Sequence, residues 1–80
     1  MKNYKTMGTK KEIILDVSEL EAPYPLVEAI NALNSLQDEE VLIFRHRMNP
    51  QMLFQNILAL GLHYEITKED ENEFEMRIYK

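Results

Sequence analysis

The first regular pattern of apolar and polar residues lies in residues 12–17, which are rich in β-branched side chains. Alternate side chains of a strand point to opposite faces, so the pattern predicts a strand with Ile13, Leu15 and Val17 on one face. A break with two prolines follows over residues 18–25. Beyond it, apolar residues recur at spacings of three and four, which is typical of an amphipathic helix. These positions are Leu26, Ala29, Ile30, Leu33 and Leu36.

The same order of strand and helix then repeats. The unbroken apolar run of residues 41–44 predicts a second strand. Asn49 followed by Pro50 predicts a helix start, because Asn can cap free N–H groups and Pro fits the first helical position. The apolar stripe of this helix comprises Met52 or Leu53, Phe54, Ile57, Leu58 and Leu60. We expect Gly61 to end the helix as a left-handed residue, with Leu62 folded back onto the last turn.

Two further alternating segments, residues 62–67 and 73–79, flank a polar stretch and predict an antiparallel hairpin. The element order is therefore βαβαββ. Crossovers of helical length imply parallel pairing of the first two strands, and right-handed crossovers place both helices on one face. The predicted fold is an α+β two-layer sandwich, a mixed four-stranded sheet with both helices on one face.

Composition and charge divide the 80 residues into two parts. Residues 1–11 hold four lysines and no acid, which predicts a disordered basic arm. Residues 12–80 hold five basic and fourteen acidic side chains, a net charge of −9, and form the predicted single domain. Such a charge opposes binding to a phosphate backbone, so we expect no nucleic-acid partner. The chain offers no apolar run of membrane length and no signal peptide, which favours a cytoplasmic protein.

Parallel strands that precede crossover helices end at the same edge of the sheet, where ligands of open sheets commonly bind. We therefore expect residues 18–25 and 45–50 to lie close together, near the positive ends of two helix dipoles. The hypothesis is a binding site for an anion or an acidic partner, built from Ala22, Tyr24, Arg45, His46, Arg47 and Asn49. The alternative is structural: Asn49 caps, Tyr24 packs, and the Arg-His-Arg run pairs with Glu19 and Glu21 or is solvated.

No motif in the chain predicts catalysis, a metal or a cofactor. The two histidines, His46 and His63, are seventeen residues apart, with no carboxylate at the spacing of a metal site. Glycine occurs only at Gly8 and Gly61, so there is no glycine-rich phosphate loop. The absence of cysteine removes thiolate nucleophiles and thiolate metal ligands. We therefore assign no catalytic, metal or cofactor residue and do not expect a self-sufficient enzyme.

Leu15-Asp16 followed by Leu20-Glu21-Ala22-Pro23-Tyr24-Pro25-Leu26 resembles the signature of the SirA/TusA-like proteins. In that family, Leu-Asp precedes a hydrophobic–x–Cys-Pro-x-Pro run that opens the first helix. The resemblance covers about residues 12–80 and includes Glu40-Val41-Leu42-Ile43 and the Asn49-Pro50 pair. The family's persulfide-carrying cysteine falls at Ala22, so this chain has no sulfur carrier. It is more similar to an uncharacterised branch that lacks the cysteine and sometimes adjoins hemerythrin-like domains; His46, Pro50 and Leu53 match that branch.

The resemblance implies a non-catalytic binding or regulatory module that contacts an anion or a protein partner through the loops before the two helices. The alternative is an accessory component of sulfur-transfer or redox/metal metabolism without its own nucleophile. The sheet face away from the helices offers a further hypothesis, weak self-association, through an apolar strip of Ile14, part of residues 41–44 and Tyr79. The alternative is that the amino-terminal arm covers this strip.

Overall fold

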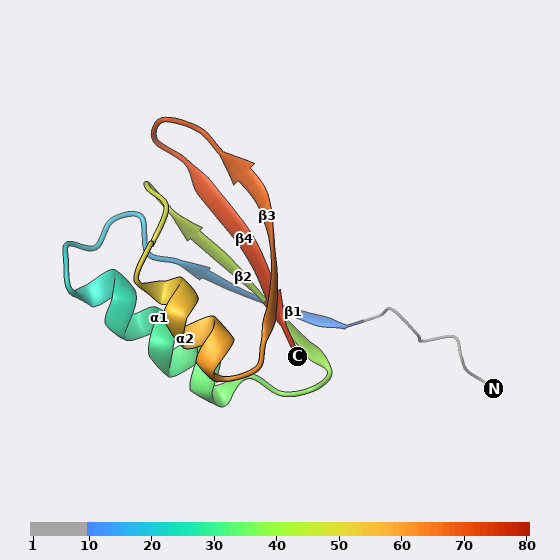
Figure 1. Ribbon diagram of the computed structural model, residues 1–80. Coiled ribbons are helices and arrows are strands. Elements are labelled where there is room, and N and C mark those ends of the chain that lie inside the picture. Colours follow the sequence, from blue (N-terminus) through green and yellow to red (C-terminus); the bar gives the residue numbers. More distant parts are fainter. Residues whose placement is uncertain (1–9) are drawn as a thin grey trace.

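The computed structural model describes residues 10–80. Its elements are β1 (Lys11–Asp16), α1 (Tyr24–Ser35), β2 (Glu40–His46), α2 (Leu53–Ala59), β3 (His63–Glu69) and β4 (Phe74–Tyr79). The strands form a sheet in the order β1-β2-β4-β3, and both helices lie on one side of it (Figure 1). The predicted α+β sandwich with a mixed sheet is confirmed. The strand β1 begins at Lys11, inside the expected arm, and the rest of that prediction, residues 1–9, lies outside the described residues.

Strand pairing places one apolar face of the sheet under the helices. β1 runs parallel to β2, and β4 runs antiparallel to both β2 and β3. The register aligns Leu15 of β1 with Phe44 of β2 and Met76 of β4, and the last two are fully buried. Leu33 of α1 and Ile57 of α2 close the core from the helix side. The spacings read from the sequence therefore identify the buried face of α1. In α2 they hold for Leu53 and Ile57 and are wrong for Leu58 and Leu60, which are 68% and 46% exposed.

The end of α2 is the predicted glycine cap. Gly61 has a φ of +71°, in the left-handed region that favours glycine. Its N–H donates to the carbonyl of Leu58 at 3.0 Å, and the N–H of Leu62 donates to the carbonyl of Ile57 at 3.0 Å. These two bonds define a Schellman motif, which satisfies carbonyls that the helix end leaves free. Leu62 is buried, as its predicted contact with the last turn requires.

The start of α2 differs from the prediction. The helix begins at Leu53 after a turn over Pro50, and no side chain caps it. The predicted capping by Asn49 is wrong: its Oδ1, the atom that would accept a helix N–H, has no partner within residues 10–80, and its side-chain amide donates to Glu69 at 2.9 Å. That partner comes from the far end of β3, and a local capping rule does not detect it. α2 is consequently only seven residues long.

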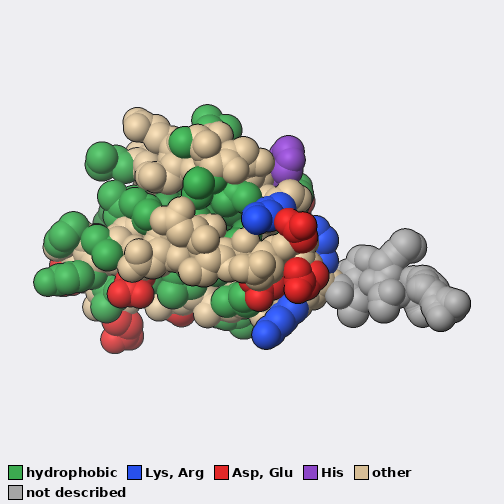
Figure 2. Space-filling view, turned by 90° about the horizontal axis from the view of Figure 1, so that it is seen from below, with side chains coloured by type: hydrophobic (Ala, Val, Ile, Leu, Met, Phe, Trp, Pro, Cys, Tyr) green, Lys and Arg blue, Asp and Glu red, His purple; other side chains and the backbone are tan. Residues whose placement is uncertain are grey.

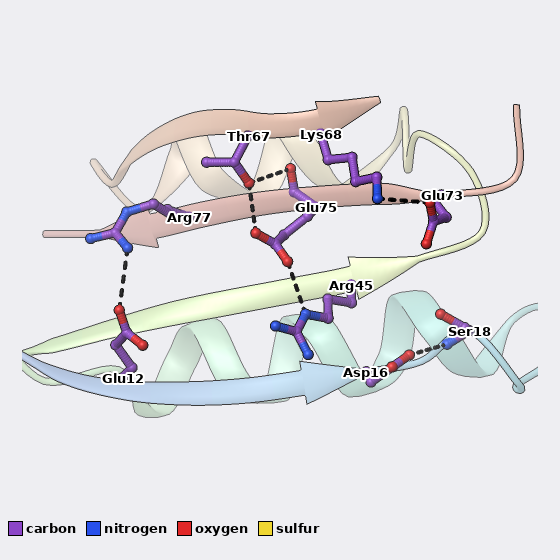
Figure 3. Close-up of polar contacts among 9 residues, drawn as sticks. All are labelled: Glu12, Asp16, Ser18, Arg45, Thr67, Lys68, Glu73, Glu75 and Arg77. Atoms are coloured by element: carbon purple, nitrogen blue, oxygen red, sulfur yellow. Dashed lines mark hydrogen bonds and ion pairs between the residues drawn. The ribbon is translucent and has the colours of Figure 1, made fainter. Parts of the chain in front are cut away.

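The sheet face away from the helices is closed by its own side chains. Val41 and Ile43 belong to this face, yet they are only 2% and 5% exposed. Their cross-strand neighbours include Glu12 and Arg77, which form an ion pair at 3.4 Å above the strands (Figure 3). Long charged side chains can cover apolar surface with their aliphatic stems. Of the apolar strip expected here, Ile14 is the clearly exposed member, at 57%.

The two outer strands differ in regularity. β1 pairs with β2 through six consecutive matched residues without interruption. β3 has a register shift between Ile66 and Lys68, so Thr67 is an extra residue in a β-bulge against β4. No helix within residues 10–80 is long and apolar enough to cross a membrane.

Candidate functional site

A groove of about 470 Å³ lies where the two crossover loops meet, at the carboxyl ends of β1 and β2. We call it the loop groove. One wall comes from residues 20–26 and the other from residues 46–53. Its lining is mainly apolar, and Ala29, Phe44 and Leu53, each fully buried, also contribute to it. The expectation that the two loops lie side by side is met, because parallel strands end at one edge of the sheet.

The groove contains four of the six residues named from the sequence: Ala22, His46, Arg47 and Asn49. Tyr24 is the first residue of α1, is 60% exposed and does not line the groove. Arg45 is also outside it, because β2 continues to His46 and successive strand residues point to opposite faces. The Nε atom of Arg45 donates to Glu75 at 2.9 Å on the face away from the helices (Figure 3).

Arg47 ties the two walls of the groove together. Its guanidinium donates to the backbone carbonyl of Leu20 at 3.1 Å and lies 3.7 Å from a carboxylate oxygen of Glu21. The pairing with Glu21 is the structural alternative that the sequence left open. The ion pair is exposed, so it contributes little to stability by itself. Arg47 is the one arginine or lysine in the lining of the groove, and these two contacts make it less available to a ligand.

His46 lies at the junction of the groove and the core. It is 8% exposed, and its ring packs edge-on against Phe44 with centroids 6.1 Å apart. The Nδ1 atom is enclosed and has no hydrogen-bond partner among the described residues. Burial, followed by the positive charge of Arg47, lowers the pKa of His46 below its ordinary value. His46 is therefore a neutral imidazole at neutral pH rather than a cation that would attract an anion.

Asn49 presents a similar feature on the loop before α2. Its Nδ2 donates to Glu69, while its Oδ1 is enclosed without a donor. Within residues 10–80, His46 Nδ1 and Asn49 Oδ1 are the enclosed side-chain atoms that lack a partner, and both residues line the loop groove. A buried polar atom without a partner costs about 1–3 kcal/mol. This cost is therefore concentrated at one place in the fold.

The rim of the groove is apolar and accessible. Met48 and Met52 line it and are 57% and 65% exposed. In Figure 2, hydrophobic side chains spread across the helix layer and project at the left end, where Figure 1 places the loops. Methionine adapts its shape readily and is common at binding surfaces. Neither methionine was predicted as a site residue; the signal that could have identified them is the complete absence of charged residues from Met48 to Leu62.

The opposite face of the sheet carries a polar hollow of about 340 Å³, whose charges are paired internally. Hydrogen bonds from Ser18 lower the pKa of Asp16, and hydrogen bonds from Arg45 and Thr67 lower the pKa of Glu75 (Figure 3). Among the described residues, no three His, Asp or Glu side chains converge to hold a metal ion. The charged groups of this hollow are therefore less available to a ligand, because they already bond to one another.

Comparison with known proteins adds no relative: no family model, curated protein or solved structure matches the chain. The βαβαββ order, the mixed sheet and the absence of cysteine are consistent with a SirA/TusA-like fold without identifying it.

Proposed function

We propose that the protein is a non-catalytic binding module of the SirA/TusA-like group, and that its loop groove receives a short apolar segment of a protein partner. The observation that carries this proposal is the mainly apolar lining of the groove, with Met48 and Met52 exposed at its rim. Ala22, at the position of the family's missing cysteine, is also part of this lining. A groove with an apolar lining and no thiol is suited to binding a partner rather than to transferring sulfur.

The charges favour an apolar segment over a free anion. The guanidinium of Arg47 is held by Leu20 and Glu21, and His46 is neutral at neutral pH. Arg45, the other cation of the sequence-based hypothesis, faces the opposite side of the sheet. α2 is too short, at seven residues, for its amino terminus to supply the second dipole that the anion hypothesis needs. The remaining attraction is burial of apolar side chains, which contributes roughly 25 cal/mol per Å².

The two enclosed atoms without partners indicate which polar chemistry the segment would bring. Asn49 Oδ1 needs a donor, and a neutral imidazole can either donate or accept at Nδ1. A peptide backbone carries N–H and C=O groups at every residue and can serve both atoms once the loops open slightly. Sulfate offers only acceptors, and phosphate, which keeps a P–OH donor at neutral pH, has no apolar group to match the lining. A peptide is therefore the better match for the groove as a whole.

The experiment is a selection of random short peptides displayed on phage against the immobilised full chain. We expect enrichment of peptides rich in leucine, methionine or phenylalanine. Met52→Glu should abolish their binding by placing a charge at the rim. The matched control is Leu58→Glu, because Leu58 is 68% exposed on α2, the helix that follows Met52, and does not line the groove. This variant should leave binding intact.

A parallel titration with inorganic phosphate and sulfate, followed by amide chemical shifts, separates the two hypotheses. Saturable shifts in residues 20–26 and 46–53 with phosphate, in the absence of enriched apolar peptides, would favour the anion site and reject the peptide groove. Enriched peptides whose binding ignores Met52→Glu would also reject it, since they bind elsewhere.

A further inference from the structure

Among residues 10–80, no strand pairs with the outer edge of β1. The N–H groups of Lys11 and Val17 donate toward β2, to the carbonyls of Glu39 and Arg45, each at 2.9 Å. Backbone groups of successive strand residues point to opposite sides, so the residues between them point the other way. Glu12, Ile14 and Asp16 therefore direct their N–H and C=O groups away from the sheet. These groups form a row of hydrogen-bonding positions on an outer strand.

The other outer strand lacks this regularity. A bulge at Thr67 interrupts β3, and charged residues, among them Glu65 and Lys68, occupy much of its length. Bulges and charges are features that protect sheet edges from pairing. β1 has neither in its centre: the residues Ile13-Ile14-Leu15 are apolar, contain no proline, and belong to an unbroken register with β2. Of the two outer strands of the described sheet, β1 is the one that can accept a partner.

We propose that this edge pairs with the same edge of a second copy of the chain, antiparallel, about a two-fold axis that passes by Ile13. Two sheets of four strands would then form one continuous sheet of eight. In this register Lys10 lies opposite Asp16 of the other copy, Glu12 lies opposite Ile14, and Ile13 lies opposite itself. The axis repeats each of the first two pairs, which gives two Lys10–Asp16 pairs of opposite charge.

The charged residues of β1 favour this register for the pairing of two copies. Moving the axis by one residue to Ile14 places Glu12 opposite Asp16, and moving it to Glu12 places that residue opposite its own copy. Like charges directly opposite each other are destabilising. Of these three axes, only the one by Ile13 joins two copies of this edge without such a pair. Asp16 is suited to the role, because its side chain accepts the N–H of Ser18 at 2.9 Å and is held as a carboxylate.

The proposed pairing also accounts for the exposure of Ile14, which is 57% exposed on a sheet face where Val41 and Ile43 are covered. An edge strand added beside β1 would cover Ile14 from the side that β2 leaves free. The surface is separate from the loop groove, and the pairing does not depend on the peptide proposal.

Single cysteines test the register directly, because the chain has none of its own. Ile13 directs its N–H toward β2, so Ile13 and its copy would form a non-hydrogen-bonded pair with Cα atoms about 4.5 Å apart. This separation permits a disulfide, whereas the Ile14 pair would be diagonal, at about 7–8 Å, and too far apart. We expect Ile13→Cys to form a disulfide-linked dimer under mild oxidation faster than Ile14→Cys, although Ile14 is the more exposed residue.

Sedimentation over a concentration series tests the association of the full chain without oxidation. We expect a reversible dimer. Ile14→Glu should weaken it by about 2- to 30-fold, because the substituted residue would lie opposite Glu12 in both pairs and like charges repel. Leu58→Glu makes the same change at another exposed site and should leave the dimer intact.

A full chain that stays monomeric at all concentrations would overturn the proposal. So would a dimer sensitive to Leu58→Glu and indifferent to Ile14→Glu, or faster crosslinking at residue 14 than at residue 13. None of these results bears on peptide binding in the loop groove, so the two proposals can fail independently.

Discussion

Gly61 permits a prediction in which backbone strain is separated from steric crowding. A Cβ added at this residue would contact no atom within 4 Å, while the φ of +71° is one that L-residues rarely adopt. Gly61→Ala should therefore cost the strain of the left-handed conformation, about 1–2 kcal/mol. The smaller conformational freedom of alanine in the unfolded chain offsets about 0.4–1 kcal/mol of this. We expect a net loss near 1 kcal/mol.

This loss is measurable because a domain of this size has a total free energy of unfolding of only about 4–12 kcal/mol. Thermal unfolding followed by circular dichroism should show a fall in Tm of about 4–8 °C, and urea unfolding should show a lower midpoint with an unchanged slope. Gly61→Asn is the matched control. Asn adopts the left-handed region more readily than Ala does, so its loss should be smaller.

An unchanged or raised Tm for Gly61→Ala would refute the assignment of Gly61 as a left-handed cap. A loss above about 3 kcal/mol would mean that the added methyl group meets a neighbour, against the open space around Gly61. An equal loss for Ala and Asn would show that the cost does not arise from φ. The bonds from Gly61 to Leu58 and from Leu62 to Ile57 would then not depend on glycine.

Two further predictions concern the loop groove. The pKa of His46 is lower in the folded protein than its ordinary value of 6.5, so the unfolded chain binds the proton more readily. The contribution of His46 to stability should be full above pH 6.5 and fall as the pH drops below it. In urea unfolding, His46→Phe should make the midpoint less dependent on pH across that range, whereas His63→Gln should not. The same dependence of the midpoint on pH in all three proteins would contradict this. Ala22→Cys should give a thiol whose pKa lies below the usual value of about 8.5, because α1 begins beside it. Its reaction with an aromatic disulfide should be faster at neutral pH than that of Leu58→Cys, and matching pH profiles would remove the analogy with the carrier cysteine.

Local rules predicted most of the fold because the features concerned are local. Hydrophobic spacing identified the buried face of α1 and the two buried residues of α2, and Gly61 marked the end of α2 through its own conformation. Asn49 shows where these rules fail. Its side chain found Glu69, twenty residues away, and α2 began later than the Asn-Pro pair indicated. The start of a helix such as α2 can depend on a contact between distant segments, and the spacing of residues in the sequence does not reveal such a contact.

The two loops of the predicted site do lie side by side, but the residues there differ from the predicted cluster of cations. The parallel order of β1 and β2 correctly brought the two loops together. The length of β2 was underestimated, however, and its continuation to His46 turns Arg45 to the far face and leaves Arg47 beside the groove. The sequence therefore indicated a cluster of cations where the fold provides an apolar groove with one paired arginine. Strand ends are set by pairing with neighbouring strands, here by Asp16 opposite Arg45 and Phe74 opposite His46.

The bulge at Thr67 has a consequence for how far any assembly of this chain can grow. If both outer strands were regular, the β1 edge of one copy could pair with the β3 edge of the next, and this head-to-tail contact would repeat without end into a filament. The bulge makes the β3 edge irregular, so it does not pair with the β1 edge of another copy. Pairing of like edges about a two-fold axis then consumes both regular edges and leaves two irregular ones outside, so growth stops at two copies.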